Sequence, residues 1–230
     1  MPTLPETLMD RLVAGFEAGH DPVRAPAMAA YMRDQFPFLG LPAPARRSRA
    51  RTALAGLPAP TEPELADVAR RCWARDEREF QQFACDYLTA HLDVPGPAFL
   101  GVLEELITSR SWWDTVDPLA THVVGGLVRR HPALLTRMDD WSTAADRWLI
   151  RTAILHQLHY GPATDAARLF AYCTRQAGHQ DFFIRKAIGW ALRHYARTDP
   201  GAVRDYLTAQ AAILSPLSIR EAAKHLSGTR

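Results

Sequence analysis

A repeat of about 34 residues is the feature that most constrains the fold of this 230-residue chain. The motif Ile-Arg-x-Ala stands at Ile150–Ala153 and recurs at Ile184–Ala187 and Ile219–Ala222, so the offsets are 34 and 35 residues. A looser copy, Phe80–Ala84, lies close to two periods earlier. A helix pair that repeats at this spacing is typical of HEAT-like α-solenoids, in which each unit packs on its neighbours. The recurrent alanine lets adjacent helices approach closely.

Apolar residues recur at helical spacings of three and four in several segments, separated by proline and glycine. The clearest are Glu79–Ala90, Pro97–Ile107, Ala145–Leu158, Phe182–Tyr195 and Ile219–Leu226. No region shows sustained alternation of apolar and polar residues, as a strand would. We therefore predict an all-α protein of about 12 helices, a HEAT-like α-solenoid of stacked antiparallel helix pairs whose concave face is the binding surface.

We expect one continuous domain over residues 1–230, with an N-terminal helical cap over 1–60 and repeats over 61–230. Leu39–Pro60 is the least regular stretch and is expected to connect the cap to the array. No apolar run approaches the roughly 18 residues that span a membrane, so we expect no membrane partner. The first residues lack the pattern of a signal peptide. We therefore expect a cytoplasmic, nucleoid-associated protein.

Arginine supplies 25 of the 27 basic side chains, and the two lysines are Lys186 and Lys224. Arginine makes better bidentate phosphate contacts than lysine, although an Ala-, Pro- and Arg-rich composition also reflects a GC-rich genome. The net charge of +2 neither demands nor excludes a nucleic-acid partner. The three cysteines are far apart, and no Cys/His cluster has zinc-ligand spacing, so we expect no metal and no cofactor.

The segment Ser-Trp-Trp-Asp-Thr-Val-Asp at 111–117 is the densest unusual one. Ser111 is a good N-cap, with Asp114 three residues later as in a capping box. In a helix that follows, Trp113 and Asp117 would be neighbours on one face, although Pro118 disfavours a helical Asp117. This pair could hold a sugar ring against an anion. The alternative is that both tryptophans fill the core and Asp114 serves only the cap.

Several cationic and aromatic residues are further candidates for a nucleic-acid surface. Arg151 lies in the repeated motif, where it has either a structural role or a phosphate contact. Trp190, four residues after Lys186, either packs in the core or offers an aromatic surface beside a cation. Arg46 and Arg47 begin an arginine-rich run that is either a solvated face or a clamp on the DNA backbone.

Four stretches together resemble a known family. They are Tyr31-Met32 with Phe36–Gly40 and Arg46-Arg47, then Ser111–Asp117, Trp148–Leu155 and Phe183–Arg193. They are similar to the AlkD-type DNA alkylation-repair glycosylases, which are built of HEAT-like repeats. The likeness runs from about residue 10 to residue 227. Members of that family are often lysine-rich, whereas this chain is almost wholly arginine, which leaves the clamp positions undetermined.

The resemblance implies a monofunctional glycosylase for base excision repair. Its substrate would be double-stranded DNA with cationic N3- or N7-alkylated purines, bound in the concave face of a monomer without required base flipping. Matched motif to motif, Trp113 and Trp190 would face the sugar, Asp117 would be the catalytic carboxylate and Arg151 would bind the DNA backbone. Tyr31 would be a further DNA contact, and Lys186 adds a cation.

The chemistry suits so small a set of residues. A purine that already carries a positive charge leaves as a neutral base, so no general acid is required. An ionised aspartate can stabilise an oxocarbenium-like sugar and orient the attacking water, while indole faces exclude solvent and favour the positive charge. The alternative function is that of a non-catalytic HEAT-like repeat protein that binds DNA structure or a protein partner.

Overall fold

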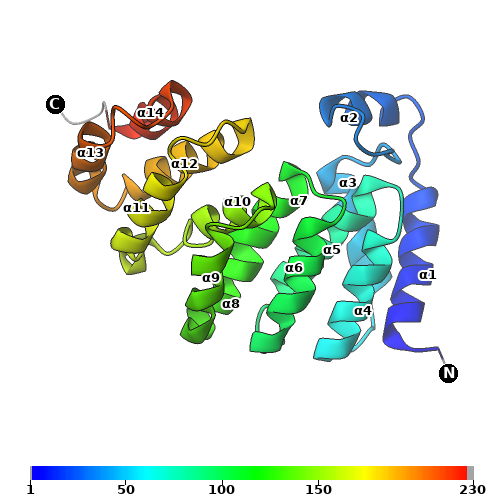
Figure 1. Cartoon of the computed structure of the whole chain (residues 1–230). Helices are drawn as coiled ribbons and strands as arrows, with labels where there is room; N and C mark the ends of the chain where they lie inside the picture. The colour runs from blue at the N-terminus through cyan, green and yellow to red at the C-terminus, as the bar shows by residue number, and fades with distance from the viewer. Residues whose placement is uncertain (1, 227–230) are drawn as a thin grey trace. The chain divides into compact units, whose positions relative to one another are not determined.

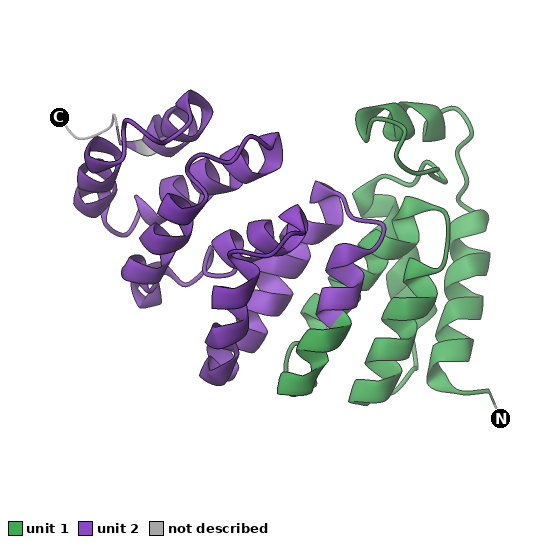
Figure 2. Ribbon diagram, in the orientation of Figure 1, with its two compact units in different colours: residues 1–102 green, residues 103–230 purple. Residues whose placement is uncertain are grey.

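The computed structural model describes residues 2–226, which form the helices α1 to α14 joined by short turns, with no strand in that range (Figure 1). The predicted all-α class is confirmed. The chain divides into two compact units, residues 1–102 and 103–230, with the division inside one helix (Figure 2). The extents predicted for a single repeat domain and its cap stay a prediction. None of the helices in the described range is long and apolar enough to cross a membrane.

Unit 1 is a set of helices around a core of aliphatic and aromatic side chains. Its elements are α1 (Leu4–Glu17), α2 (Ala25–Tyr31), α3 (Ala43–Leu54), α4 (Glu62–Trp73), α5 (Arg78–Ala90), the 3-10 turn η1 (Pro97–Phe99) and the start of α6 (Leu100–Thr108). α1 packs on α3 and α4, and α4 packs on α5. Phe16 of α1 is fully buried, with its ring centroid 5.1 Å from that of Phe80 on α5.

The stretch Leu39–Pro60 is more regular than expected, because most of it is α3. Pro42 is the N-cap of this helix and Pro44 lies in its first turn, where a proline costs no helical hydrogen bond. Alanine and arginine, which made the stretch look like a linker, are both good helix formers.

A buried carboxylate shapes the loop that leads into α3. Glu79 of α5 is fully buried, and its carboxylate accepts hydrogen bonds from the backbone N–H groups of Leu39, Gly40 and Leu41, at 2.9 to 3.0 Å. Gly40 has φ +85°, a left-handed conformation that favours glycine. The Phe36–Gly40 motif is thus held in place by an acid that lies almost 40 residues further along the chain.

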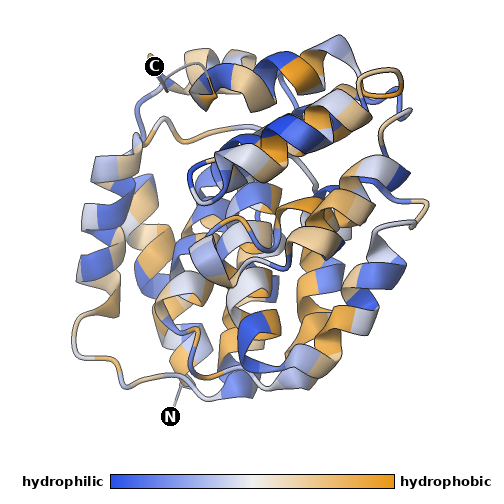
Figure 3. Cartoon of the chain, turned by 90° about the vertical axis from the view of Figure 1, so that its left-hand side faces the viewer, coloured by the Kyte–Doolittle hydropathy of each residue, from blue (hydrophilic) through white to orange (hydrophobic). Residues whose placement is uncertain are grey.

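Unit 2 begins within α6, contains the repeated motif and is also built of short helices joined by turns. Its elements are α7 (Trp113–Pro118), the π-helical segment η2 (Leu119–Val124), α8 (Gly125–Arg130), η3 (Pro132–Leu134), α9 (Leu135–Trp141), α10 (Arg147–Leu155), η4 (Gly161–Ala163), α11 (Ala166–Arg175), α12 (Phe182–Tyr195), α13 (Pro200–Ala209), α14 (Pro216–Ala222) and η5 (Ala223–His225). α10 packs on α7, η2, α9, α11 and α12, and α12 packs on α14. Hydrophobic and hydrophilic residues lie on different stripes of single helices (Figure 3).

Side-chain hydrogen bonds in unit 2 link positions about one repeat apart. Examples are Arg137 to Glu104 (2.7 Å), Arg147 to Asp181 (2.9 Å), Tyr160 to the carbonyl of Gly125 (2.7 Å) and Tyr172 to Asp139 (2.7 Å). Each joins residues separated by 33 to 35 positions. This pattern is expected of a repeat array, because each unit contacts chiefly its neighbours.

The helix caps correct the register of the sequence repeat. The N-cap residues of α10, α12 and α14 are Asp146, Asp181 and Ser215, respectively. The side chain of each accepts hydrogen bonds from backbone N–H groups in the first turn of its helix. Counted from these caps, Arg151, Lys186 and Arg220 each occupy the fifth position. The Ile-Arg-x-Ala motif instead aligned Arg151 with Arg185. Arg185 occupies the fourth position after the cap of α12, so the sequence alignment of this repeat is one residue out of register with the structure.

A buried histidine, His156, lies against the backbone of Gly125 in the preceding repeat. His156 follows α10 and is fully buried, and its Nδ1 lies 2.7 Å from the carbonyl of Ala153. A Cβ at Gly125 would stand 2.3 Å from the carbonyl oxygen of His156, so only glycine permits this approach. Burial lowers the pKa of His156 from 6.5 to about 4.

His156 therefore predicts a loss of stability in mild acid. The unfolded chain takes up a proton at this side chain near pH 6.5, whereas the folded chain resists until about pH 4. Stability is full above pH 6.5 and falls through that window by up to about 1.4 kcal/mol per pH unit, roughly 3 kcal/mol in all. Urea unfolding of His156→Gln should show a shallower acid loss than the wild type. His20→Gln, at an exposed site, is the control, and equal pH slopes for all three proteins would contradict the prediction.

Candidate active site

The Trp-Trp-Asp segment begins a helix in a different way from the one expected. The N-cap of α7 is Trp112, whose side chain makes no cap hydrogen bond, and Asp114 lies in the first turn. Ser111 lies one residue earlier and its hydroxyl donates to the carbonyl of Ile107 at 2.6 Å. The prediction of Ser111 as the N-cap is therefore wrong. The left-handed turn at Arg110 (φ +47°) leaves Ser111 beside the end of α6 instead.

Asp117 is helical despite the proline after it. Trp113 and Asp117 both lie within α7, four residues apart, which confirms that they share one helix face. Pro118 brings no N–H to the helix, and the chain continues into the π-helical segment η2. The hydroxyl of Thr121 donates to the carbonyl of Asp117 at 2.8 Å. A proline and a local π-helix are recognised causes of irregular helix geometry, and π-bulges are frequent at functional sites.

Asp117 and Arg151 form a bidentate ion pair between two repeats. Arg151 Nε donates to Asp117 Oδ1 at 2.6 Å, and Nη2 donates to Oδ2 at 2.8 Å. The remaining terminal nitrogen, Nη1, donates to the carbonyl of Phe183 in the first turn of α12. The side chains are only 13% and 5% exposed. One guanidinium therefore joins α7, α10 and α12.

Two opposing effects act on the Asp117 carboxyl. Burial raises the pKa of Asp117 above its ordinary value, and the hydrogen bonds and charge of Arg151 work against that rise. Both carboxyl oxygens accept an N–H from Arg151. Because an ionised carboxylate offers acceptors at both oxygens and a protonated one carries a hydrogen on one of them, this geometry favours the anion.

The tryptophans of this region divide into core and site residues. Trp112 is buried, with ring centroids 5.1 Å from Phe183 and 6.1 Å from Trp148, so its expected core role is confirmed. Trp113 is half-buried, one turn before Asp117. Trp190 is also half-buried and lies two turns after Phe183 on the same face of α12. Arg151 therefore ties the Asp117 carboxylate to the helix that carries Trp190.

Lys186 lies in a cluster of cations around one acid. Glu221 of α14 is close to the ammonium groups of Lys186 (3.0 Å) and Lys224 (2.5 Å) and to the guanidinium of Arg193 (3.0 Å). Lys224 and Lys186 lower the pKa of Glu221 to about 2. Three positive charges around one negative charge leave a local excess of two. The pairing of Arg193 with Glu221 could not be predicted from spacing along the chain, because the two residues lie on different helices, α12 and α14, that the fold brings together.

The remaining candidates belong to unit 1. Tyr31 ends α2 and is 72% exposed. Arg46 is buried and bonds to Asp86 at 2.9 Å and to Gln82. Arg47 reaches the same aspartate at 3.3 Å, with 60% of its side chain exposed. Arg46 thus has internal partners, while Tyr31 and Arg47 present surface, and their DNA contacts stay predictions.

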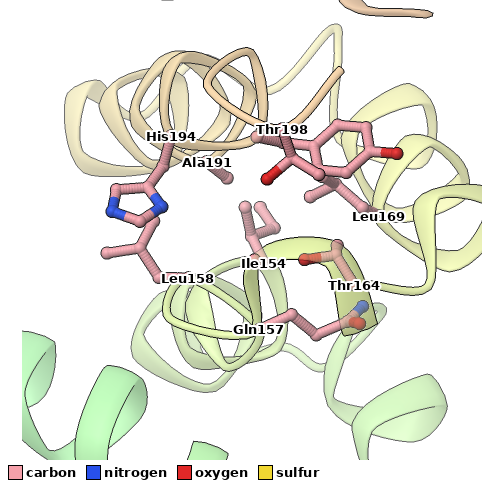
Figure 4. Close-up of a pocket in the computed structure, with 10 residues that line it drawn as sticks. Ile154, Gln157, Leu158, Thr164, Leu169, Ala191, His194 and Thr198 are labelled. Carbon is pink, nitrogen blue, oxygen red and sulfur yellow. The ribbon is translucent and has the colours of Figure 1, made fainter.

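A small pocket opens between α10, α11 and α12 in unit 2 (Figure 4). His194 and Leu158 lie on one side of it, and Thr164 and Leu169 lie on the other. Its volume of about 10 Å³ has room for roughly one water molecule. It is therefore too small to receive a purine base.

Comparisons with known proteins place this chain in a family. The model of the DNA alkylation repair enzymes matches residues 12–226. The chain belongs to the DNA alkylation repair enzyme family. It is also similar to a solved structure, a predicted DNA alkylation repair enzyme from Enterococcus faecalis, with 29% sequence identity and a TM-score of 0.82. That likeness covers 91% of this chain and 97% of the other, and it confirms the α-solenoid fold expected for the family. No curated protein matches the chain.

The buried ion pair leads to a prediction for stability. Arg151→Met would leave the Asp117 carboxylate buried without its partner, a change that typically costs about 3–5 kcal/mol. Asp117→Asn/Arg151→Met should recover part of this loss, because a neutral amide is cheaper to bury than a charge. Chemical denaturation of the single and double variants measures both effects. A loss below about 1 kcal/mol for Arg151→Met, typical of exposed pairs, would contradict a buried pair.

Proposed function

We propose that this member of the DNA alkylation repair family is a monofunctional DNA glycosylase that hydrolyses the N-glycosidic bond of cationic N3- or N7-alkylated purines in duplex DNA. The observation that carries the proposal is the Asp117 carboxylate. It is nearly buried, paired with Arg151 from the next repeat, and one helical turn from the half-buried Trp113. An anion fixed beside an aromatic face suits a sugar that becomes positively charged.

The reaction needs one bond to break and one to form. The bond between C1′ and the purine nitrogen breaks, and both of its electrons go to the base, which leaves neutral because it began as a cation. The sugar becomes an oxocarbenium-like cation, which the Asp117 carboxylate stabilises electrostatically. A water oxygen then bonds to C1′ and gives up a proton. The raised pKa of Asp117 makes its carboxylate a better acceptor for that proton.

Arg151 acts in this proposal by positioning Asp117. Its three hydrogen bonds, two to Asp117 and one to the carbonyl of Phe183, occupy both ends of the guanidinium. A DNA-backbone contact from Arg151 would have to share these donors. Each Asp117 oxygen keeps a second lone pair, and 13% of the side chain is exposed, so a water molecule can still reach it.

The aromatic side chains supply the rest of the site. The indole faces of Trp113 and Trp190 would exclude water from the deoxyribose and favour its positive charge. Recognition through the sugar and backbone would not require the base to flip. Lys186, Tyr31, Arg46 and Arg47 are proposed DNA contacts. We propose a monomer that acts on DNA in the nucleoid of the cytoplasm.

Release of free base from alkylated DNA tests this function. Purified protein should release N7-methylguanine from a methylated duplex above the spontaneous rate. Asp117→Asn should lower single-turnover excision at least about 100-fold while DNA affinity changes less than about threefold, because the variant loses the negative charge at the sugar. Since the substitution also leaves the buried Arg151 without its counter-charge, a thermal melting curve checks that the variant is folded at the assay temperature. Fluorescence polarisation with the same duplex gives the affinity.

Asp205→Asn is the matched control, since this aspartate lies exposed on α13 in the same unit. It should leave both excision and affinity unchanged. Equal losses of excision and affinity in Asp117→Asn would argue against a catalytic aspartate. DNA binding without any base release by the wild type would favour a non-catalytic binder of DNA structure.

A further inference from the structure

Three histidines from successive repeats form a row of neighbouring rings in unit 2, called here the histidine row. His122 lies in η2, His159 follows α10 and His194 lies on α12, at offsets of 37 and 35 residues. The ring centroids of His122 and His159 are 4.6 Å apart with planes at 16°, and those of His159 and His194 are 5.4 Å apart and nearly perpendicular. His122 and His159 are exposed, and His194 is half-buried at the edge of the small pocket (Figure 4).

The histidine row lies beside the candidate active site. Each imidazole follows a proposed site residue on the same stretch of chain. His122 comes five residues after Asp117, and in a π-helical segment this is close to one turn. His194 comes four residues after Trp190 on α12, about 6 Å along the helix axis. A sugar held between Asp117 and Trp190 would therefore have its flanking phosphates near the histidine row.

The histidine row is rich in donors and carries no balancing acid. Within residues 2–226, none of the three imidazoles has a hydrogen-bond or ion-pair partner. The charged or titratable groups that act on His159 and His194 are His122, the two imidazoles themselves, Arg193 of α12, and Arg197, which follows α12. Arg193 is held by Glu221, whereas Arg197 is exposed and its side chain has no partner in the described range.

The electrostatics of the histidine row favour an incoming anion. Burial lowers the pKa of His159, and the neighbouring His122 lowers it further. Burial also lowers the pKa of His194, with His159, Arg197 and Arg193 adding to the effect. No acidic group is among the groups that shift the pKa of either ring. An anion that supplies a negative charge would raise both pKa values, so by linkage it would bind more tightly as the pH falls.

A metal ion is a poorer fit to this geometry. No group of three or more potential metal ligands among residues 2–226 has an arrangement that could hold one. His122 and His159 stack ring on ring, so their nitrogens do not converge on a common point. A linear polyanion fits better than a single small anion, because the donors are spread along the repeats.

We propose that His122, His159 and His194, with Arg197, form a binding site for the backbone phosphates that flank the target nucleotide, and that the imidazoles take up protons as DNA binds. The assignment rests on the proposed function, because the adjacent site must receive DNA. The phosphates are recognised by imidazole N–H donors and an unpaired guanidinium. The histidine row adds affinity, while the chemistry stays with Asp117 and the tryptophans.

The test is DNA affinity against pH for His122→Gln/His159→Gln/His194→Gln, in which glutamine keeps a polar side chain but cannot take up a proton. With an unmodified duplex at fixed salt, the wild type should bind at least about tenfold more tightly at about pH 6 than at about pH 8, as one net proton taken up allows tenfold per pH unit. The triple variant should show less than about a threefold change. His20→Gln/His131→Gln, outside the histidine row, should behave as the wild type. A triple variant that keeps the wild-type pH dependence would overturn the proposal.

Four further measurements separate the outcomes. The thermal melting temperature of the triple variant shows whether its loss of pH-dependent DNA affinity comes from unfolding. The titration of DNA affinity against pH is repeated for the single variant His159→Gln, whose exposed site makes a folding defect less of a concern. NMR titration of the imidazoles should give raised pKa values with duplex DNA but not with inorganic phosphate; a rise with inorganic phosphate alone would overturn the assignment to DNA. Single-turnover excision of an alkylated duplex by the wild type and by His20→Gln/His131→Gln tests the glycosylase proposal separately. Absence of excision in every protein would contradict the glycosylase proposal while leaving the affinity result intact.

Discussion

The buried pair of Asp117 and Arg151 is the interaction on which the candidate site depends. A carboxylate at 13% exposure is costly to leave unpaired, and the guanidinium that pairs with it is itself only 5% exposed. Two parallel N–H···O bonds and a third bond to the carbonyl of Phe183 satisfy both groups. The pair therefore fixes the anion in one place relative to α12 and, through that helix, to Trp190. The position of the carboxylate therefore depends on side chains from two neighbouring repeats, Asp117 on one and Arg151 on the next.

The repeat architecture explains why so few residues suffice. Neighbouring units place equivalent positions side by side, so residues about 34 apart in the chain become direct partners, as Asp117 and Arg151 do. The same spacing joins Arg147 to Asp181 and brings the rings of His159 and His194 to 5.4 Å. A site that spans several repeats can thus be assembled from one or two side chains on each, with the apolar core of every repeat left intact.

Much of the fold and part of the site could be predicted from the sequence. Periodicity and the 34-residue repeat gave the all-α class, and the family resemblance pointed to Trp113, Asp117, Arg151 and Trp190. The Asp117–Arg151 bond itself lay out of reach, because spacing along the chain does not reveal which side chains of adjacent repeats face each other. The prediction of Ser111 as an N-cap was wrong because the left-handed conformation of Arg110 directs the Ser111 hydroxyl to the end of α6 and away from the start of α7. The equivalence of Lys186 with Arg151 could not be predicted either, because it depends on the residue at which α12 begins. In the structure the N-cap of α12 is Asp181, which puts Lys186 at the same helix position as Arg151.

Pro118 connects the helix irregularity to the surface beside the site. A regular α-helix would bring residues 113, 117, 120 and 121 to one face, with position 122 turned about 140° away from position 117. The π-helical segment after Pro118 underwinds the chain, so that a residue five positions on comes back toward the face of Asp117. His122 can then stack on His159 of the next repeat at 4.6 Å. The proline that seemed to argue against a helical Asp117 is thus compatible with it, and in the proposed site the irregularity that follows turns the first imidazole of the histidine row closer to the side of the carboxylate than a regular α-helix would.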